Sequence, residues 1–319
     1  MDRIEVIKKW IKTQINQEFK LYLASSDASF RRYFRVVSNN KTYILMDAPP
    51  QLERIDQFVN ITDKLVAAEI NSPKIISFNT ELGFILMTDF GSQTFLDVLD
   101  NNNSHKLYPK AIHSLLKMQT KVDSQGLQDY SEDLLVSEMA LFPEWYLTKL
   151  KKFNLEDQAL LNNIFSFISK KILTQNKCFV HRDYHSRNLM FIAEGEPGIL
   201  DYQDAVEGPL TYDLVSLLKD AYIEWDEDFV LDQAVRYWEK AKKAGLIKNE
   251  DFSGFYEDFE WMGVQRHLKI LGIFSRLSIR DKKDQYLKDI PLVEKYLMLT
   301  SERYKNLHPL RKILDKVIS

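Results

Sequence analysis

The chain has 319 residues, a length that allows a large hydrophobic core and favours two lobes over one. Its 43 Lys and Arg residues nearly balance its 46 Asp and Glu residues, which argues against nucleic acid or an anionic membrane as a partner. The single cysteine, Cys178, excludes an internal disulfide, and no apolar run reaches the roughly 18 residues that span a bilayer. We therefore expect a cytoplasmic protein with no obligate protein partner.

Residues 1–92 favour a small β-rich lobe. Apolar residues at positions 4, 7, 10 or 11, and 15 recur at helical spacing and predict a first amphipathic helix. Three β-rich runs follow, FKLYLAS, SFRRYFRVV and KTYILMD, and turn-forming Ser, Asp and Asn residues separate them. A helical stripe over residues 55–66 then precedes two more strands, KIISFN and FILMTDF. We predict an antiparallel sheet in this lobe.

Residues 93–319 favour a second, mainly helical lobe. Three short strand-like runs, CFVHRD, NLMFI and GILDYQD, interrupt it between residues 178 and 204. The predicted helices cover residues 106–122, 131–150, 156–175, 226–245, 251–277 and 287–305. Together the two lobes predict an α+β fold.

The run His181-Arg-Asp-Tyr-His-Ser-Arg-Asn188 places Asp183 and Asn188 at the catalytic-loop spacing of kinases. Phosphoryl transfer from ATP needs a carboxylate to accept the proton of the attacking hydroxyl, and Asp183 suits that role. An amide oxygen and a second carboxylate help to hold Mg²⁺. Asn188 and Asp201, which ends the apolar run GILD, suit those two roles.

The alternative is that these Asp and Asn residues only cap turns, as they commonly do. The order of Asp183, Asn188 and a strand-ending Asp201 favours the kinase interpretation over that alternative. His181 is expected to shape the loop. Asp89-Phe90-Gly91 also spells D-F-G, but it precedes the catalytic loop, whereas the magnesium aspartate of kinases follows it. We interpret Asp89 as a turn or capping residue in the connection between the lobes.

Only residues 202–209 separate Asp201 from the next predicted helix. This leaves no room for a long activation segment or a peptide-docking platform. The spacing therefore favours a small-molecule acceptor over a protein acceptor. Asp213, at the start of that helix, is expected to support the catalytic loop through backbone hydrogen bonds, with an ordinary helix-start carboxylate as the alternative.

At these residues the chain resembles the aminoglycoside phosphotransferase family. The resemblance implies a bilobal protein-kinase-like fold, with ATP and Mg²⁺ as cofactors. DASFRRYFRV, ILMDAPP, LFPEWYL, HRDYHSRNLM and LDYQDAVEGPLTYDLVSLLKDAY are most similar to the bacterial anomeric kinases of N-acetylmuramate and N-acetylglucosamine within this group. That resemblance implies phosphorylation of the C1 hydroxyl of an amino sugar, in peptidoglycan recycling.

Two features depart from the general kinase pattern. The loop of residues 25–29 has no glycine, and the third strand ends in Met46-Asp47 without a phosphate-pairing lysine. A cation must come from elsewhere: Arg31, Arg32 and Arg35 lie on the strand after the loop and alternate between its faces, so one or two of them could reach the phosphates, with solvated strand arginines as the alternative. The ATP-binding residues that we predict, in the loop, on this strand and in the connection between the lobes, are Ser29, Phe30, Arg31, Arg32, Met87 and Asp89.

Substrate selection is expected around the catalytic loop and after Asp201, because the accepting hydroxyl must come within about 3 Å of Asp183. Arg187 or His185 suits the carboxylate of N-acetylmuramate. Trp145 is a candidate aromatic wall for a sugar ring, with an ordinary core aromatic as the alternative. The predicted substrate-binding residues are His185, Arg187, Gln203, Asp204, Glu207 and Trp145.

The leading hypothesis is an ATP-dependent amino-sugar kinase. A second hypothesis keeps the fold and chemistry but takes an aminoglycoside, choline or a homoserine-type alcohol as the acceptor. A third, from another class, is a catalytically silent nucleotide-binding module, which only the missing lysine and glycines support.

Overall fold

The computed structural model describes residues 2–26, 30–248 and 251–318. By its internal contacts the chain divides into two compact units. The first runs to Val98 and also takes in Leu189–Asp204; the second comprises Leu99–Asn188 and the chain from Ala205. The predicted lobe boundary after residue 92 stays a prediction. An antiparallel sheet organises the first unit and helices dominate the second, so the predicted α+β class is confirmed.

Five strands in the order β1-β2-β3-β5-β4 form the sheet of the first unit. Asn39 takes a left-handed φ of 51° in the two-residue turn between β2 and β3, a conformation that asparagine tolerates better than most residues. The Asn-Asn signal in the sequence is therefore a tight hairpin turn. The strands are β1 (Lys20–Ser26), β2 (Arg32–Ser38), β3 (Lys41–Asp47), β4 (Ile75–Asn79) and β5 (Phe84–Thr88).

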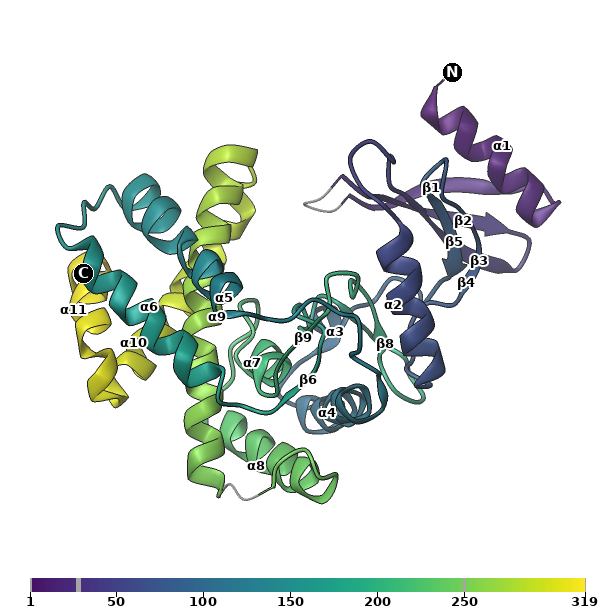
Figure 1. Ribbon diagram of the computed structural model, residues 1–319. Helices are drawn as coiled ribbons and strands as arrows, with labels where there is room; N and C mark the ends of the chain where they lie inside the picture. The colour runs from purple at the N-terminus through teal and green to yellow at the C-terminus, as the bar shows by residue number, and fades with distance from the viewer. Residues whose placement is uncertain (1, 27–29, 249–250, 319) are drawn as a thin grey trace. The chain divides into compact units, whose positions relative to one another are not determined.

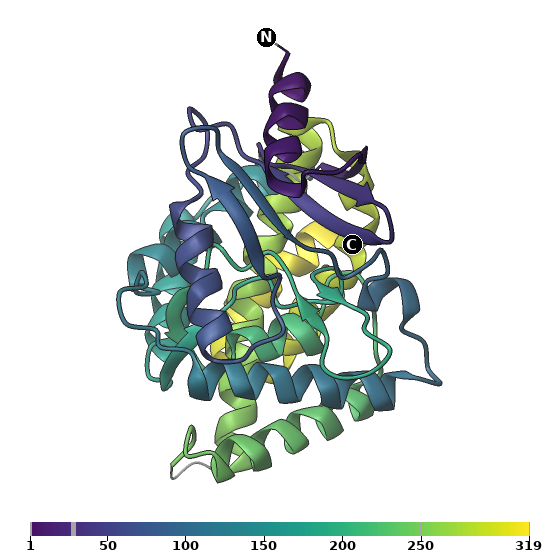
Figure 2. The same cartoon turned by 90° about the vertical axis from the view of Figure 1, so that its right-hand side faces the viewer.

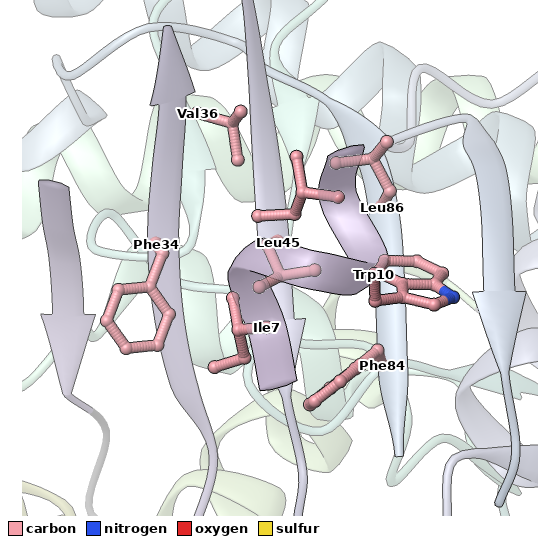
Figure 3. Packing of buried hydrophobic residues seen from close by; sticks show 8 residues of the cluster. Ile7, Trp10, Phe34, Val36, Leu45, Phe84 and Leu86 are labelled. Carbon is pink, nitrogen blue, oxygen red and sulfur yellow. The ribbon is translucent and has the colours of Figure 1, made fainter. Parts of the chain in front are cut away.

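Helix α1 (Arg3–Ile15) covers one face of this sheet (Figure 1). Its buried residues Ile7, Trp10 and Ile11 pack on apolar side chains from three strands. Figure 3 shows Ile7 and Trp10 against the sheet residues Phe34, Val36, Leu45, Phe84 and Leu86. Because side chains alternate along a strand, the residues between these point to the opposite face.

Helix α2 (Asp56–Ala67) belongs to the same unit and buries Phe58, Ile61 and Leu65. Phe58 packs on Tyr202, with ring centroids 5.0 Å apart, and the hydroxyls of Thr62 and Tyr202 lie 2.9 Å apart. These contacts tie the segment after Asp201 to α2. The unit also contains α3 (Phe95–Val98) and the two-stranded ribbon of β7 (Leu189–Met190) and β8 (Gly198–Ile199).

Helix α9 (Phe252–Asp281) is the long central helix of the second unit (Figure 1). It is buried along most of its length and contacts α5, η1, α6, α7 and α10. Figure 2 shows α8 running beside α4, which it contacts. The remaining elements are α4 (Ser104–Lys121), α5 (Glu132–Met139), η1 (Phe142–Leu150), α6 (Gln158–Ile172), β6 (Lys177–Val180), β9 (Val206–Pro209), α7 (Tyr212–Leu218), α8 (Glu227–Lys243), η2 (Asp284–Asp289), α10 (Ile290–Arg303), η3 (Lys305–Leu307) and α11 (His308–Ile318).

The predicted helix over residues 131–150 is the clearest difference from the sequence expectation. It is two elements, α5 and η1, and η1 is a π-helix. The periodic apolar residues were recognised, but wider winding after Leu141 cannot be read from that pattern. Among the described residues no helix combines the length and apolarity needed to cross a membrane.

Candidate active site

The predicted catalytic loop begins after β6, and a buried carboxylate holds its start. The backbone N–H groups of His181 and Arg182 donate to the two oxygens of Asp213, at 2.6 and 3.0 Å. The backbone N–H of Asp183 donates to His181 Nδ1 at 3.2 Å, so His181 shapes the loop. Asp213 therefore supports the loop as predicted, by accepting hydrogen bonds from its backbone.

A second carboxylate, Asp220, holds the middle of the loop. The backbone N–H of Ser186 donates to it at 2.9 Å and the Ser186 hydroxyl at 2.5 Å. The amide nitrogen of Asn188 donates to the Asp183 carbonyl oxygen at 3.0 Å and fixes the orientation of the Asn188 side chain. The loop is thus held in its shape within the second unit by hydrogen bonds at its start, middle and end.

Arg182 has a left-handed φ of 76°, which is strained for a residue with a long side chain. Its guanidinium pairs with the buried carboxylate of Glu138 from α5. Glu138 also accepts a hydrogen bond from Tyr130 and pairs with Lys269 of α9 at 2.9 Å. This buried network stabilises the strained backbone beside Asp183.

Asp183 sits among positive charges in the second unit. Burial alone would raise the pKa of its carboxyl group, but Lys269, His185 and Arg266 act in the opposite direction, and the pKa lies below its usual value. The side chain is therefore a carboxylate at neutral pH. A carboxylate is the form that can accept a proton from an attacking hydroxyl.

Two predicted substrate residues, His185 and Arg187, share aromatic neighbours. The ring of His185 packs on the ring of Tyr222 with centroids 5.3 Å apart. The Arg187 guanidinium lies 4.7 Å from the centroid of the same ring and 6.0 Å from that of Tyr286. Arg187 is exposed, so this aromatic support orients a cation that remains accessible to a ligand.

Asp201 follows β8 in the first unit and has a left-handed φ of 61°, which aspartate tolerates better than most residues. Its Oδ1 accepts a hydrogen bond from Gln203 at 3.0 Å, and Gln203 also donates to Asp204 at 3.1 Å. The Asp201 side chain is 30% exposed. An exposed carboxylate at a strand end can bind a metal that also binds phosphate oxygens.

The donor set fits Mg²⁺. Asn188 and Asp201 offer an amide oxygen and a carboxylate, the hard oxygen ligands that Mg²⁺ prefers. In the described part of the chain no three His, Cys, Asp or Glu side chains gather in a metal-binding group. A Mg²⁺ ion held by one or two side chains together with substrate phosphates needs no such group.

A pocket of about 580 Å³ lies within the first unit. Three predicted site residues line it, Arg31, Gln203 and Asp204. Of the other predicted ATP residues, Phe30 is 64% exposed and Met87 is buried, and Ser29 lies outside the described residues. The other residues that line the pocket are Met46, Ala48, Leu52, Glu53, Arg54, Asp56, Gln57 and Phe58.

Asp89, in the connection after β5, accepts hydrogen bonds from Arg35 at 2.7 Å and from the Gly91 backbone at 2.8 Å. Arg35 also donates to the Gly91 carbonyl oxygen at 2.6 Å. Asp89 is thus a turn residue, as its position before the catalytic loop suggested. Arg32 pairs with Asp47 at 2.6 Å on the sheet face that α1 covers.

The remaining two predicted substrate residues, both in the second unit, contact residues outside the predicted catalytic loop. Glu207 lies on β9 and accepts a hydrogen bond from Ser124 at 2.7 Å. The ring of Trp145, on η1, is covered by the Lys149 ammonium group at 3.4 Å from its centroid. A sugar ring could stack on Trp145 only on its other face or after Lys149 moves.

Several residues that shape the predicted site were not predicted from the sequence. Glu53, Glu138, Asp220 and Lys269 have no local motif, and each acts on a residue distant in the chain. One signal was available: a glutamate or lysine in an apolar helical stripe is rarely buried without a charged partner. That signal identifies the buried residue but not its partner.

Comparisons with known proteins identify the family of the chain. A model of the phosphotransferase enzyme family matches residues 21–246. N-acetylmuramate/N-acetylglucosamine kinase of Neisseria meningitidis serogroup B is 41% identical, over 100% of this chain and 97% of that protein. The protein of the same name from Pseudomonas aeruginosa is 43% identical, over 92% of this chain and 88% of that protein.

Solved structures show the same fold at low sequence identity. Choline kinase from Streptococcus pneumoniae superposes with a TM-score of 0.68 at 13% identity, over 93% of this chain and 99% of that one. The predicted kinase-like fold is thereby confirmed, as is the prediction of a phosphotransferase enzyme. The family match spans most of the chain and includes the catalytic loop, Asp201 and Asp213. This chain therefore belongs to the phosphotransferase enzyme family.

Proposed function

We propose that this phosphotransferase transfers the γ-phosphoryl group of ATP to the C1 hydroxyl of N-acetylmuramate or N-acetylglucosamine. The observation that carries the proposal is the 41% identity, over the whole chain, to a kinase named for these two sugars. A role in peptidoglycan recycling and a cytoplasmic location, where ATP is made, follow from this substrate choice.

In the proposed reaction Asp183 accepts the proton of the C1 hydroxyl as the sugar oxygen attacks the γ-phosphorus. The bond from this phosphorus to the bridging oxygen of ATP breaks, and ADP leaves. Asn188 and Asp201 would hold Mg²⁺, which neutralises phosphate charge. The depressed pKa of Asp183 keeps its side chain ionised and therefore able to accept a hydrogen bond from the attacking hydroxyl.

Of the residues expected to bind ATP, we retain Phe30, Arg31, Met87 and Asp89 in the proposed site, and Ser29 by its sequence position alone. Arg32 is left out because its ion pair with Asp47 lies on the face that α1 covers.

For the sugar we propose His185 and Arg187 as main contacts, with Arg187 meeting the carboxylate of N-acetylmuramate. We also propose as sugar-binding residues Gln203 and Asp204, which line the pocket of the first unit. The other two proposed sugar-binding residues are Glu207 and Trp145.

The test is ATP consumption by the purified chain with Mg²⁺ and a panel of acceptors: the two amino sugars, an aminoglycoside and choline. We expect turnover with the amino sugars and a sugar 1-phosphate by ³¹P NMR. Asp183→Asn should lower kcat by about 10²- to 10⁴-fold, because it removes the base. Turnover with a cationic acceptor alone would refute the sugar assignment, and full turnover by Asp183→Asn would refute the base.

A further inference from the structure

A phosphotransferase needs a cation at the phosphates of its nucleotide, and β3 ends without the lysine that usually supplies it. Arg31, Arg32 and Arg35 are the candidate cations, all at or near β2. They differ in which face of the sheet they occupy and in which carboxylate they meet.

Arg32 and Arg35 each have a structural partner. Arg32 donates to Asp47 Oδ2 at 2.6 Å, while Arg3 of α1 donates to Oδ1 of the same fully buried carboxylate at 2.6 Å. Arg35 pairs with Asp89, whose side chain is also buried. Removing either arginine would leave a buried carboxylate with fewer cations, so both side chains stabilise the first unit.

Arg31 lies close to a different set of carboxylates. It is 7% exposed and pairs with Glu53, in the segment between β3 and α2. Its terminal nitrogens lie 3.8 Å from Asp201 Oδ1 and 3.9 Å from Asp204 Oδ2.

Arg31 lies both in a pocket and beside a proposed metal ligand. It lines the pocket of about 580 Å³ together with Glu53 and Asp204, and it lies beside Asp201, the proposed Mg²⁺ ligand. If Asp201 holds Mg²⁺ as proposed, the ion would draw the phosphates of the nucleotide toward this carboxylate, and Arg31 is a cation beside it.

We propose that Arg31 is the cation that binds the phosphates of ATP, in place of the strand lysine of other kinases, and that Glu53 orients it. This inference rests on the proposed function because it takes ATP as the phosphate donor. Arginine suits the position because its planar fork can bind phosphate and carboxylate at the same time, whereas a lysine ammonium acts as a point charge.

The experiment compares Arg31→Ala with Arg32→Ala, a change of the neighbouring arginine on the opposite sheet face. Binding of ATP and of adenosine to the full chain is measured by calorimetry with Mg²⁺, alongside kcat and the KM for ATP. We expect Arg31→Ala to weaken ATP binding by about 10- to 100-fold and to leave adenosine binding within about twofold. Arg32→Ala should lower the melting temperature and keep the affinity for ATP.

Arg31→Lys and Glu53→Gln are milder substitutions that test the same role of Arg31. They replace Arg31→Ala in the experiment if that variant does not fold. Both should raise the KM for ATP by a smaller factor than Arg31→Ala, without changing adenosine affinity. Equal losses of ATP and adenosine affinity in the Arg31 variants would assign Arg31 to structure alone and overturn the proposal. An unchanged KM for ATP in the Arg31 variants would also overturn it. So would a larger loss of ATP affinity in Arg32→Ala than in Arg31→Ala.

The two proposals can fail separately. A wild-type chain that binds ATP but phosphorylates no amino sugar refutes the proposed substrate, while the comparison of ATP with adenosine still tests Arg31. A wild-type chain that binds ATP no more tightly than adenosine overturns the role of Arg31 directly.

Discussion

Asp213 is one of two buried carboxylates that hold the predicted catalytic loop. It is fully buried and accepts two backbone hydrogen bonds, from residues 181 and 182. Burial raises the pKa of its carboxyl group to about 7, although the two backbone donors act in the opposite direction. If Asp183 is the base as proposed, Asp213 acts on catalysis indirectly, by positioning the backbone that leads to Asp183.

We expect Asp213→Asn to lower kcat by about 10- to 100-fold with little change in the KM for ATP. One oxygen is replaced by an amide nitrogen, which faces a backbone N–H and cannot accept its hydrogen bond. Losing a hydrogen bond to a charged group costs about 1.5–3 kcal/mol. Steady-state kinetics at pH 7.5 provide the measurement.

Asp226→Asn is the matched control. Asp226 also accepts a backbone hydrogen bond, from Phe229 at 2.7 Å, but as the exposed N-cap of α8. Asparagine is an equally good N-cap, so we expect wild-type kinetics. If Asp213→Asn were as active as this control, the loop would not depend on the carboxylate.

At the scale of elements, α9 and η1 approach one another closely at Gly272. A Cβ atom there would lie 2.4 Å from the Leu141 Cβ and 2.7 Å from its backbone oxygen. A glycine in a helix interior normally costs up to about 1 kcal/mol relative to alanine. Here the missing side chain permits close packing, which explains a glycine in the middle of a buried helix.

We expect Gly272→Ala to destabilise the protein by about 1–3 kcal/mol, because overpacking must push α9 and η1 apart. Gly263→Ala, on the same helix, is the control: a Cβ there meets no atom closer than 3.7 Å. Helix propensity should make that variant equal to or more stable than wild type. Urea denaturation measures the free energy of unfolding of both variants. Equal values for the two variants would contradict the close contact at Gly272.

At the scale of the whole molecule, buried titratable groups link stability to pH. His267 of α9 is fully buried, stacks on Tyr296 and donates from Nε2 to the Lys219 carbonyl oxygen at 3.2 Å. Burial, reinforced by the positive charge of Lys219, lowers the pKa of His267 to about 3. Below pH 6.5 the unfolded chain binds a proton here that the folded chain does not.

The contribution of His267 to stability is therefore lost as the pH falls below 6.5. We expect this loss to reach about 2 kcal/mol at pH 5, at about 1.4 kcal/mol per pH unit. Between pH 7.5 and 5, the free energy of unfolding should therefore fall by about 2 kcal/mol less in His267→Gln than in wild type. His308→Gln, at an exposed histidine, should behave as wild type, and an unchanged drop in His267→Gln would refute the linkage.

Much of the fold could be predicted from the sequence because its signals are local. Strand runs alternate with period 2 and helices have period 3.6 within one element, so their positions were recognised. The predicted catalytic loop places Asp183 and Asn188 in one short segment, and this motif, with Asp201 a short distance after it, supported the family resemblance. The π-helical winding of η1 was not predicted, because apolar spacing alone does not distinguish it from an α-helix.

The sequence by itself determined the α+β class, the phosphotransferase family and the order of the candidate catalytic groups. Only the tertiary structure decided which charged side chains form ion pairs. Arg31 and Arg32 are neighbours in the chain, yet one meets Glu53, 22 positions away, and the other Asp47, 15 positions away. Arg182 meets Glu138 across 44 positions. Such ion pairs depend on how strands and helices pack, and no local pattern encodes them.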